Sequence, residues 1–130
     1  TINDIRIGNE KVITVVGCGG DRDVTKRPKM AHIAAQLSSQ AIFTSDNPRS
    51  ENPQTILDAM EVGVSSENYK KTLTVLDRRQ AIKTACKLAE AKDIILIAGK
   101  GHENYQELNG VRSHFDDLEE VINCFKQLKK

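Results

Sequence analysis

The chain has 130 residues, 38% of them hydrophobic, which is enough for one domain with a single core. Its 19 basic and 18 acidic residues leave a formal charge of +1, which excludes the strong basic excess of proteins that coat nucleic acids or membrane surfaces. No apolar run approaches transmembrane length and no signal-peptide pattern is present. We therefore expect a cytoplasmic protein with no nucleic-acid partner and no membrane insertion.

The first part of the chain predicts two strands separated by a helix. Val12–Val16 is rich in β-branched residues and runs into glycines, which indicates a buried strand. A helix is predicted from Pro28 to Leu37, because proline is tolerated in the first turn of a helix. Ala41–Thr44 is again apolar and predicts the second strand.

The middle of the chain predicts a second helix and a third strand. Pro53–Met60 has the pattern of a helix, with Asn52 placed to cap its N-terminus and Gly63 available to end it. Thr72–Leu76 predicts the third strand.

A third helix precedes the most apolar strand of the chain. Asp77 is an N-cap residue for this helix, which we expect to run through Glu90, and Ile94–Ala98 is the strand. The apolar residues of the helix share one face. They are Ala81, Ile82, Ala85, Leu88 and Ala89.

A hairpin and a last helix are predicted after that strand. The dipeptide Asn109-Gly110 is typical of a two-residue turn, and it joins Tyr105–Leu108 to Val111–Phe115. The last helix starts near Asp116 or Asp117. Its apolar positions are Leu118, Val121, Ile122 and Phe125.

This alternation of strands and helices predicts an α/β fold: a Rossmann-like, mostly parallel sheet with helices on both faces and a C-terminal hairpin. Ligands of such sheets bind at the carboxyl ends of the strands. Three loops leave those ends, at Gly17–Arg27, Asp46–Asn52 and Gly99–Gln106. We therefore expect these loops to line one edge of the sheet and to carry the functional site.

The loop after the second strand contains the most informative segment, Asp46-Asn47-Pro48-Arg49-Ser50-Glu51-Asn52-Pro53. Its two prolines and two asparagines predict a rigid corner that presents one guanidinium and two carboxylates. A planar guanidinium on a stiff turn is suited to bidentate capture of a carboxylate or phosphate. The corner therefore predicts a recognition site.

The loop after the first strand, Gly17-Cys18-Gly19-Gly20-Asp21-Arg22-Asp23, is rich in glycine. Glycines let the backbone approach an anion closely and expose its amide donors. A dinucleotide-binding fingerprint fails because Arg22 replaces its third glycine, although a nicotinamide-binding oxidoreductase stays open as an alternative. The chain has no phosphate loop of the Gly-x-x-x-x-Gly-Lys-Ser/Thr type.

The third loop contains Gly99-Lys100-Gly101-His102-Glu103. Adjacent residues on an extended segment point to opposite sides, so His102 and Glu103 are not expected to form a direct acid–base pair. Glu103 is suited to anchor a substrate ammonium group, and His102 is either structural or close to a phosphate. Together with Arg22 and Arg49, this loop suits a zwitterionic ligand with more than one carboxylate. The alternative is a solvated polar loop with weak surface ion pairs.

Two further groups of residues leave alternatives open. Lys26-Arg27-Pro28 is either a solvated helix start or a contact for the phosphates of ATP. The three cysteines lack metal-ligand spacing and a neighbouring base, so we expect reduced thiols in the core or loops and no metal site. They are Cys18, Cys86 and Cys124.

Three motifs occur together in a fixed order: Gly-Cys-Gly-Gly-Asp-Arg-Asp-x-x-Lys-Arg-Pro at 17–28, Asp-Asn-Pro-Arg-x-Glu-x-Pro at 46–53 and Gly-Lys-Gly-His-Glu-x-Tyr-Gln at 99–106. They closely resemble the C-terminal domains of Mur ligases, in the branch that adds diaminopimelate as the third residue of the peptidoglycan stem peptide. The resemblance covers essentially the whole chain.

The resemblance implies an ATP-dependent ligase of peptidoglycan synthesis. In the family, ATP phosphorylates the D-glutamate side chain of UDP-N-acetylmuramoyl-L-alanyl-D-glutamate, the amine of meso-diaminopimelate attacks the acyl phosphate, and Mg²⁺ offsets the phosphate charge. By motif, the residues that hold meso-diaminopimelate would be Arg22, Asn47, Arg49, Gly99 and Glu103, with Asp46, Lys26 and His102 as supporting candidates. No catalytic residue and no metal ligand is expected in this domain.

The resemblance also singles out Arg49 as the residue that selects the amino acid. Lysine-adding relatives carry a small residue there, and diaminopimelate is lysine with an additional distal carboxylate. A fixed arginine pairs with that carboxylate and is left unpaired by lysine, so discrimination on the order of 10⁴ is attainable in a well-built site.

The family's phosphate loop, modified lysine and metal ligands belong to a central domain. We therefore expect residues 1–130 to be an excised C-terminal domain that does not catalyse ligation alone, with the central ATP-binding and N-terminal UDP-binding domains outside this chain. A lysine-adding paralogue and a stand-alone small-molecule binding module are the alternatives.

Overall fold

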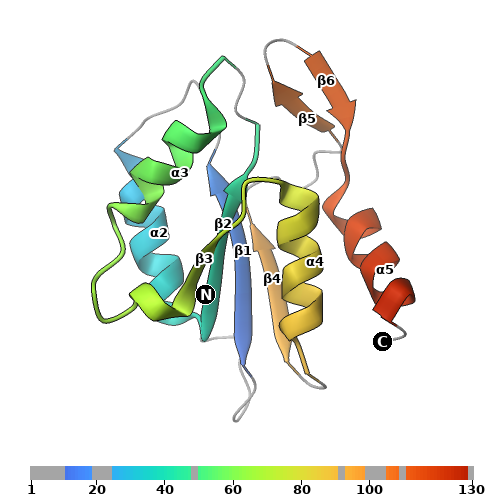
Figure 1. Ribbon diagram of the computed structural model, residues 1–130, viewed down its shortest axis with the longest axis horizontal. Coiled ribbons are helices and arrows are strands. Elements are labelled where there is room, and N and C mark those ends of the chain that lie inside the picture. The colour runs from blue at the N-terminus through green and yellow to red at the C-terminus, as the bar shows by residue number, and fades with distance from the viewer. Residues whose placement is uncertain are drawn as a thin grey trace.

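The computed structural model describes residues 11–18, 25–47, 50–90, 93–98, 105–108 and 111–128 (Figure 1). Four parallel strands form one sheet in the order β3-β2-β1-β4, and two antiparallel strands form a separate hairpin. The elements are β1 (Val12–Cys18), α2 (Lys26–Leu37), β2 (Gln40–Ser45), α3 (Pro53–Glu61), a 3₁₀ helix η1 (Tyr69–Lys71), β3 (Thr72–Thr74), α4 (Arg78–Leu88), β4 (Ile94–Ala98), β5 (Tyr105–Leu108), β6 (Val111–His114) and α5 (Asp117–Leu128).

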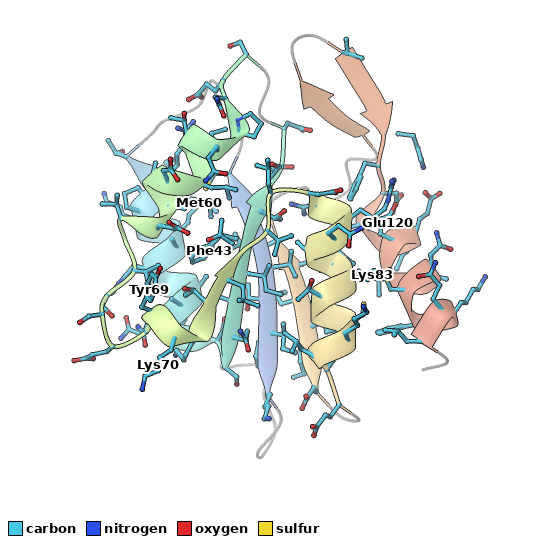
Figure 2. All side chains as sticks on the ribbon, in the orientation of Figure 1. Phe43, Met60, Tyr69, Lys70, Lys83 and Glu120 are labelled. Carbon is cyan, nitrogen blue, oxygen red and sulfur yellow. The ribbon has the colours of Figure 1, made fainter. Side chains whose placement is uncertain are left out.

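Helices cover both faces of the sheet. α2 and α3 pack on one face, where Val16 and Phe43 contribute to a shared apolar cluster. α4 and α5 pack on the other face, over Ile13 and Val15. The side chains of a strand point alternately to opposite faces, so β1 serves both layers. Phe43 and Met60 lie between the sheet and α3 in Figure 2. The predicted α/β fold is confirmed.

The ends of the helices follow the predicted caps. The Asn52 side chain accepts a hydrogen bond from the Gln54 backbone N–H at 2.9 Å, and Asp77 accepts one from Arg79 N–H at 2.9 Å. At α5 the cap is Asp116, whose Oδ1 accepts from the backbone N–H groups of the next turn. Asp117, the first residue of α5, therefore keeps its carboxylate for another partner.

Several predicted boundaries and faces are corrected by the structure. α2 begins at Lys26 rather than Pro28, β3 ends at Thr74 rather than Leu76, and α4 ends at Leu88 rather than Glu90. Among the described strands, β3 lies at the edge of the sheet and pairs with β2 alone. The Val75 N–H still donates to the Phe43 carbonyl oxygen at 2.9 Å, but the strand goes no further.

In α4 and α5, fewer of the apolar residues that we predicted to face the core are buried. Leu88 of α4 is exposed, and Cys86 is buried in the core instead. In α5, Leu118 and Ile122 are exposed, while Cys124 is buried. α5 is the outermost helix and packs on one side only, so the flanks of its apolar stripe stay uncovered (Figure 1). No helix in the described ranges is both long and apolar enough to cross a membrane.

Candidate functional site at the carboxyl edge of the sheet

The strands of the parallel sheet point the same way, so their carboxyl ends lie at one edge, at the top of Figure 1. β1 and β2 approach each other very closely there. A Cβ atom built on Gly17 would lie 2.8 Å from the Thr44 carbonyl oxygen and 3.0 Å from the Asp46 amide nitrogen. Both contacts are with backbone that cannot move aside easily, so glycine is required at this position. The backbone of Asp46 is thereby held against the end of β1.

Two of the predicted site residues lie at this edge. Asp46 and Asn47 directly follow β2, and both are buried; Asn47 is only 1% exposed. Both residues therefore belong to the buried part of this edge. Lys26 lies exposed at the start of α2. The remaining predicted site residues lie outside the described residues: Arg22, Arg49, Gly99, His102 and Glu103.

One interpretation of the 26–28 segment, a solvated helix start, is wrong for Arg27. Its side chain is buried, and its Nη2 donates to Glu51 Oε2 at 2.7 Å. This ion pair joins the first turn of α2 to the corner that follows β2. Glu51 therefore has an internal partner, whereas the sequence pattern had suggested that the corner presents both its carboxylates to a ligand. The pair helps to hold the corner against α2.

The thiol at the end of β1 is a core group. Burial raises the pKa of the Cys18 thiol; the nearby Arg27 guanidinium acts in the opposite direction, and the Asp46 carboxylate adds to the rise. A thiol with a raised pKa is protonated at neutral pH and is a poor nucleophile. All three cysteines are free and buried, so the structure places them in the core rather than in exposed loops.

Among the described residues at this edge, Arg78, the first residue of α4, is the most completely buried charged residue, at 1% exposure. Its Nε and Nη2 each donate to one oxygen of the Asp117 carboxylate, both at 2.8 Å, in a bidentate pair. Nη1 donates to the Ser45 carbonyl oxygen at 3.0 Å, and Nη2 also donates to the Ala98 carbonyl oxygen at 3.3 Å. One guanidinium thus contacts the last residue of β2, the last residue of β4 and the first residue of α5.

Arg78 was not singled out from the sequence, and Arg27 was considered only as a solvated residue or a phosphate contact. The spacing of apolar residues nevertheless indicates that both arginines lie on buried helix faces. Arg78 lies three, four and seven positions before Ala81, Ile82 and Ala85, which places it on the apolar face of α4. Asp117 likewise lies four and seven positions before Val121 and Cys124, on the apolar face of α5. A charged residue in phase with an apolar stripe indicates a buried ion pair.

The described residues of this edge hold its elements rigidly in place. Two buried arginines tie strand ends, helix starts and the corner together, and the buried thiol is protonated. Within the described ranges, no three His, Cys, Asp or Glu side chains are grouped to hold a metal ion. An open, mainly apolar hollow of about 910 Å³ lies away from this edge, beside Leu88, Ile95 and Phe125, and the described site residues Lys26, Asp46 and Asn47 do not line it.

Comparison with known proteins supplies the family context. A family model described as "Mur ligase, glutamate ligase domain" matches residues 1–101. A relative from Bacteroides thetaiotaomicron, named UDP-N-acetylmuramoyl-L-alanyl-D-glutamate–2,6-diaminopimelate ligase, is 57% identical over 95% of this chain and 26% of its own length. Relatives with the same name from Cytophaga hutchinsonii and Bacillus licheniformis are 60% and 51% identical, over 90% and 92% of this chain and 24% of each relative.

A solved structure has the same fold. It is titled as the structure of a UDP-N-acetylmuramoyl-L-alanyl-D-glutamate–2,6-diaminopimelate ligase, and it superposes with a TM-score of 0.88 at 44% identity. The match covers 98% of this chain and 26% of that one. The chain thus spans about a quarter of the length of the relatives that it matches.

Proposed function

Because the chain belongs to the family of Mur ligase, glutamate ligase domains, we propose that it is the C-terminal, amino-acid-binding domain of an ATP-dependent ligase. The proposed ligase adds meso-diaminopimelate to UDP-N-acetylmuramoyl-L-alanyl-D-glutamate in the cytoplasm, during synthesis of the peptidoglycan precursor. The observation that carries the proposal is the high identity, over nearly the whole chain, to relatives that are named for this reaction.

The proposed task of this domain is to bind and orient the incoming amino acid. Arg22, Asn47, Arg49, Gly99 and Glu103 are proposed to hold meso-diaminopimelate, with Glu103 facing an ammonium group and the arginines facing carboxylates. Holding the attacking amine in a defined position removes much of the entropic barrier to attack on an activated carboxyl group. The burial of Asn47 at the end of β2 supports this role, because it gives the corner a fixed starting point.

Arg49 is proposed to choose between diaminopimelate and lysine. Its guanidinium would pair with the distal carboxylate that lysine lacks. The ion pair of Glu51 with the buried Arg27 supports the proposal, because it restrains the corner that carries Arg49. A restrained guanidinium loses less conformational entropy on binding than one on a freely moving loop.

ATP and Mg²⁺ are assigned to other parts of the ligase. When bound, they supply the activated phosphoryl group and offset its charge. The chain has no phosphate loop, and its described residues have no metal-ligand cluster, so the described residues do not form a complete site for these groups. A central domain outside residues 1–130 is the proposed site, and no step in this domain is derived through ATP or the metal. Lys26 remains a candidate for a phosphate contact from this side, since it is exposed at the start of a helix.

The test is the reaction of the full-length ligase that contains this domain. ADP and phosphate should be released only when the UDP-linked dipeptide and meso-diaminopimelate are both present. Turnover with lysine and none with diaminopimelate would assign the protein to the lysine-adding branch. Tight binding of a small zwitterion without any ATP turnover would favour the stand-alone binding module.

Replacement of Arg49 by Ala should lower kcat/KM for diaminopimelate by about 100-fold, because a charge-assisted bidentate contact contributes about 3 kcal/mol. KM for ATP should stay within a factor of about two. Lys70→Ala is the matched control, since Lys70 is an exposed basic residue on η1 at the lower left of Figure 2. An Arg49→Ala variant with an unchanged kcat/KM for diaminopimelate would remove Arg49 from the selecting role.

A further inference from the structure

We propose that Arg78 is a positioning residue for the amino-acid site. Through one guanidinium it fixes the carboxyl ends of β2 and β4 relative to each other and to the start of α5. This inference rests on the proposed function only for its kinetic readout. The contacts themselves are those of the Ser45 and Ala98 carbonyls and the Asp117 carboxylate.

The guanidinium bridges two strands that are not neighbours. In the sheet order β3-β2-β1-β4, β1 separates β2 from β4, so no backbone ladder connects them directly. Arg78 spans the carboxyl end of β1 and donates to the last carbonyl of each outer strand. The backbone ladders of the described strands relate these two ends indirectly, since each strand pairs separately with β1. Arg78 supplies a direct link between them at the edge where ligands of such sheets bind.

The same guanidinium also contacts both ends of the chain segment that connects β4 to α5. Ala98 ends β4, Asp117 begins α5, and both contact Arg78. The chain therefore leaves this guanidinium after Ala98 and returns to it at Asp117. The intervening part of the sequence includes Gly99 and Glu103, two of the proposed ligand residues. On the β2 side, Asp46 and Asn47 directly follow the Ser45 carbonyl that Arg78 holds.

Only arginine can make this set of contacts. The planar guanidinium has five N–H donors in a fixed fork, and the four hydrogen bonds of Arg78 use donors on all three of its nitrogens. A lysine has one compact ammonium group and cannot form a bidentate pair while reaching two carbonyls on either side of β1. Because Arg78 is buried and its partners are only partly exposed, water has little access to replace a lost contact. Lysine at this position is therefore expected to loosen the edge while keeping the charge.

Arg79 is a matched control on the next residue. It also belongs to the first turn of α4 and also pairs with a carboxylate of α5, since its Nε donates to Glu120 Oε1 at 2.9 Å. Its side chain is 58% exposed, however, and no hydrogen bond from it to a strand-end carbonyl is recorded among the described residues. Arg79→Lys therefore tests the loss of an α4–α5 ion pair without the loss of the link between β2 and β4.

The experiment compares Arg78→Lys and Arg79→Lys in the full-length ligase. Arg78→Lys should raise KM for the amino-acid substrate by at least about tenfold, since a misplacement of about 1 Å in a site can cost about 100-fold. KM for ATP and for the UDP-linked dipeptide should stay within a factor of about two in both variants. Arg79→Lys should leave all three KM values close to those of the wild type.

Asp117→Asn gives a second, milder variant if Arg78→Lys does not fold. It keeps the size of the side chain and the strand-end contacts of Arg78 but removes the charge that orients the guanidinium, so KM for the amino acid should rise by a smaller factor, with the other two KM values unchanged. A fall in Tm with an unchanged KM for the amino acid, in either variant, would overturn the proposal and make Arg78 a purely structural residue.

Hydrogen exchange separates this proposal from the proposed function. In Arg78→Lys, backbone amides at the ends of β2 and β4 should exchange faster than in Arg79→Lys. If the wild type does not use diaminopimelate, the proposed function fails, and the exchange rates still test the positioning role. Equal exchange rates at both strand ends in the two variants would count against that role, whatever the substrate.

Discussion

At the scale of single residues, the neighbours Arg78 and Arg79 show how position decides the role of identical side chains. Arg78 is in phase with the apolar face of α4 and is buried, whereas Arg79 is one residue further on and is exposed. Arg79 pairs with Glu120, and its guanidinium lies 5.6 Å from the centre of the Phe115 ring. Such an exposed pair contributes at most about 1 kcal/mol. The buried Arg78 instead binds backbone carbonyl groups at the ends of two strands.

His114, at the end of β6, gives a prediction for pH dependence. Its Nε2 lies 2.6 Å from Glu119 Oε2, and the hydrogen bond and negative charge of Glu119 raise the pKa of His114, with smaller contributions from Asp116 and Glu120. Because the folded-state pKa is raised, the stabilisation from this pair is fully present below the ordinary histidine pKa and is lost as the pH rises through the raised pKa.

Glu119→Gln should therefore lower the pKa of His114, and an NMR titration of the imidazole ring will measure the change. Glu120→Gln is the comparison, and it should shift the pKa less, because Glu120 acts on His114 only through its charge. A titration curve for His114 that does not change in Glu119→Gln would contradict the assigned cause.

At the scale of elements, the start of α2 and the corner after β2 are held together by a charge pair. The Arg27 side chain is buried in phase with Ala31, Ala34 and Ala35 of α2, and Glu51 reaches it from the segment just before α3. Asn52 then caps α3. The corner between β2 and α3 is thus fixed at both ends, by burial of Asn47 at one and by this pair and cap at the other.

Glu51→Ala should destabilise the protein by about 1–3 kcal/mol, because it leaves a buried guanidinium without its carboxylate partner. Urea denaturation will measure the free energy of unfolding. Glu119→Ala is the control, since it removes a carboxylate from an exposed pair, and its cost should stay below about 1 kcal/mol. Equal costs for the two variants would show that burial of Arg27 adds nothing to the pair.

At the scale of the whole molecule, one sheet separates two apolar layers. Ile56 belongs to the layer under α2 and α3, and Ile82 belongs to the layer under α4 and α5. Both side chains are buried, and β1 contributes residues to both layers. Because a single sheet is shared, loss of packing in either layer is expected to weaken the same cooperative unit.

Ile56→Val and Ile82→Val should each lower the free energy of unfolding by about 1 kcal/mol, since each removes one buried methylene group. In the double variant the losses should add to about 2 kcal/mol, because the two sites lie on opposite faces of the sheet. Urea unfolding followed by circular dichroism should show one transition in all variants. Two separate transitions in the double variant would mean that the layers unfold independently.

The sequence was sufficient for most of the architecture but not for the structural role of the charged residues at the edge. Strand and helix periods, together with the cap residues Asn52 and Asp77, predicted the elements because these signals are local. The motifs likewise predicted the family, which the comparisons confirm. The ion pair of Arg27 with Glu51 was missed because the two residues are 24 positions apart, and a local pattern does not show whether a basic residue meets water or a distant carboxylate.

What the sequence determined by itself is the order of elements, the edge at which the carboxyl ends of the strands lie and the family, since each depends on residues close together in the chain or on whole motifs. Only the tertiary structure decided that Arg78 bridges β2, β4 and α5, and that Glu51 has Arg27 as a partner. The physical reason is that a buried guanidinium needs several acceptors at once, and here they come from segments that only the folded sheet brings together.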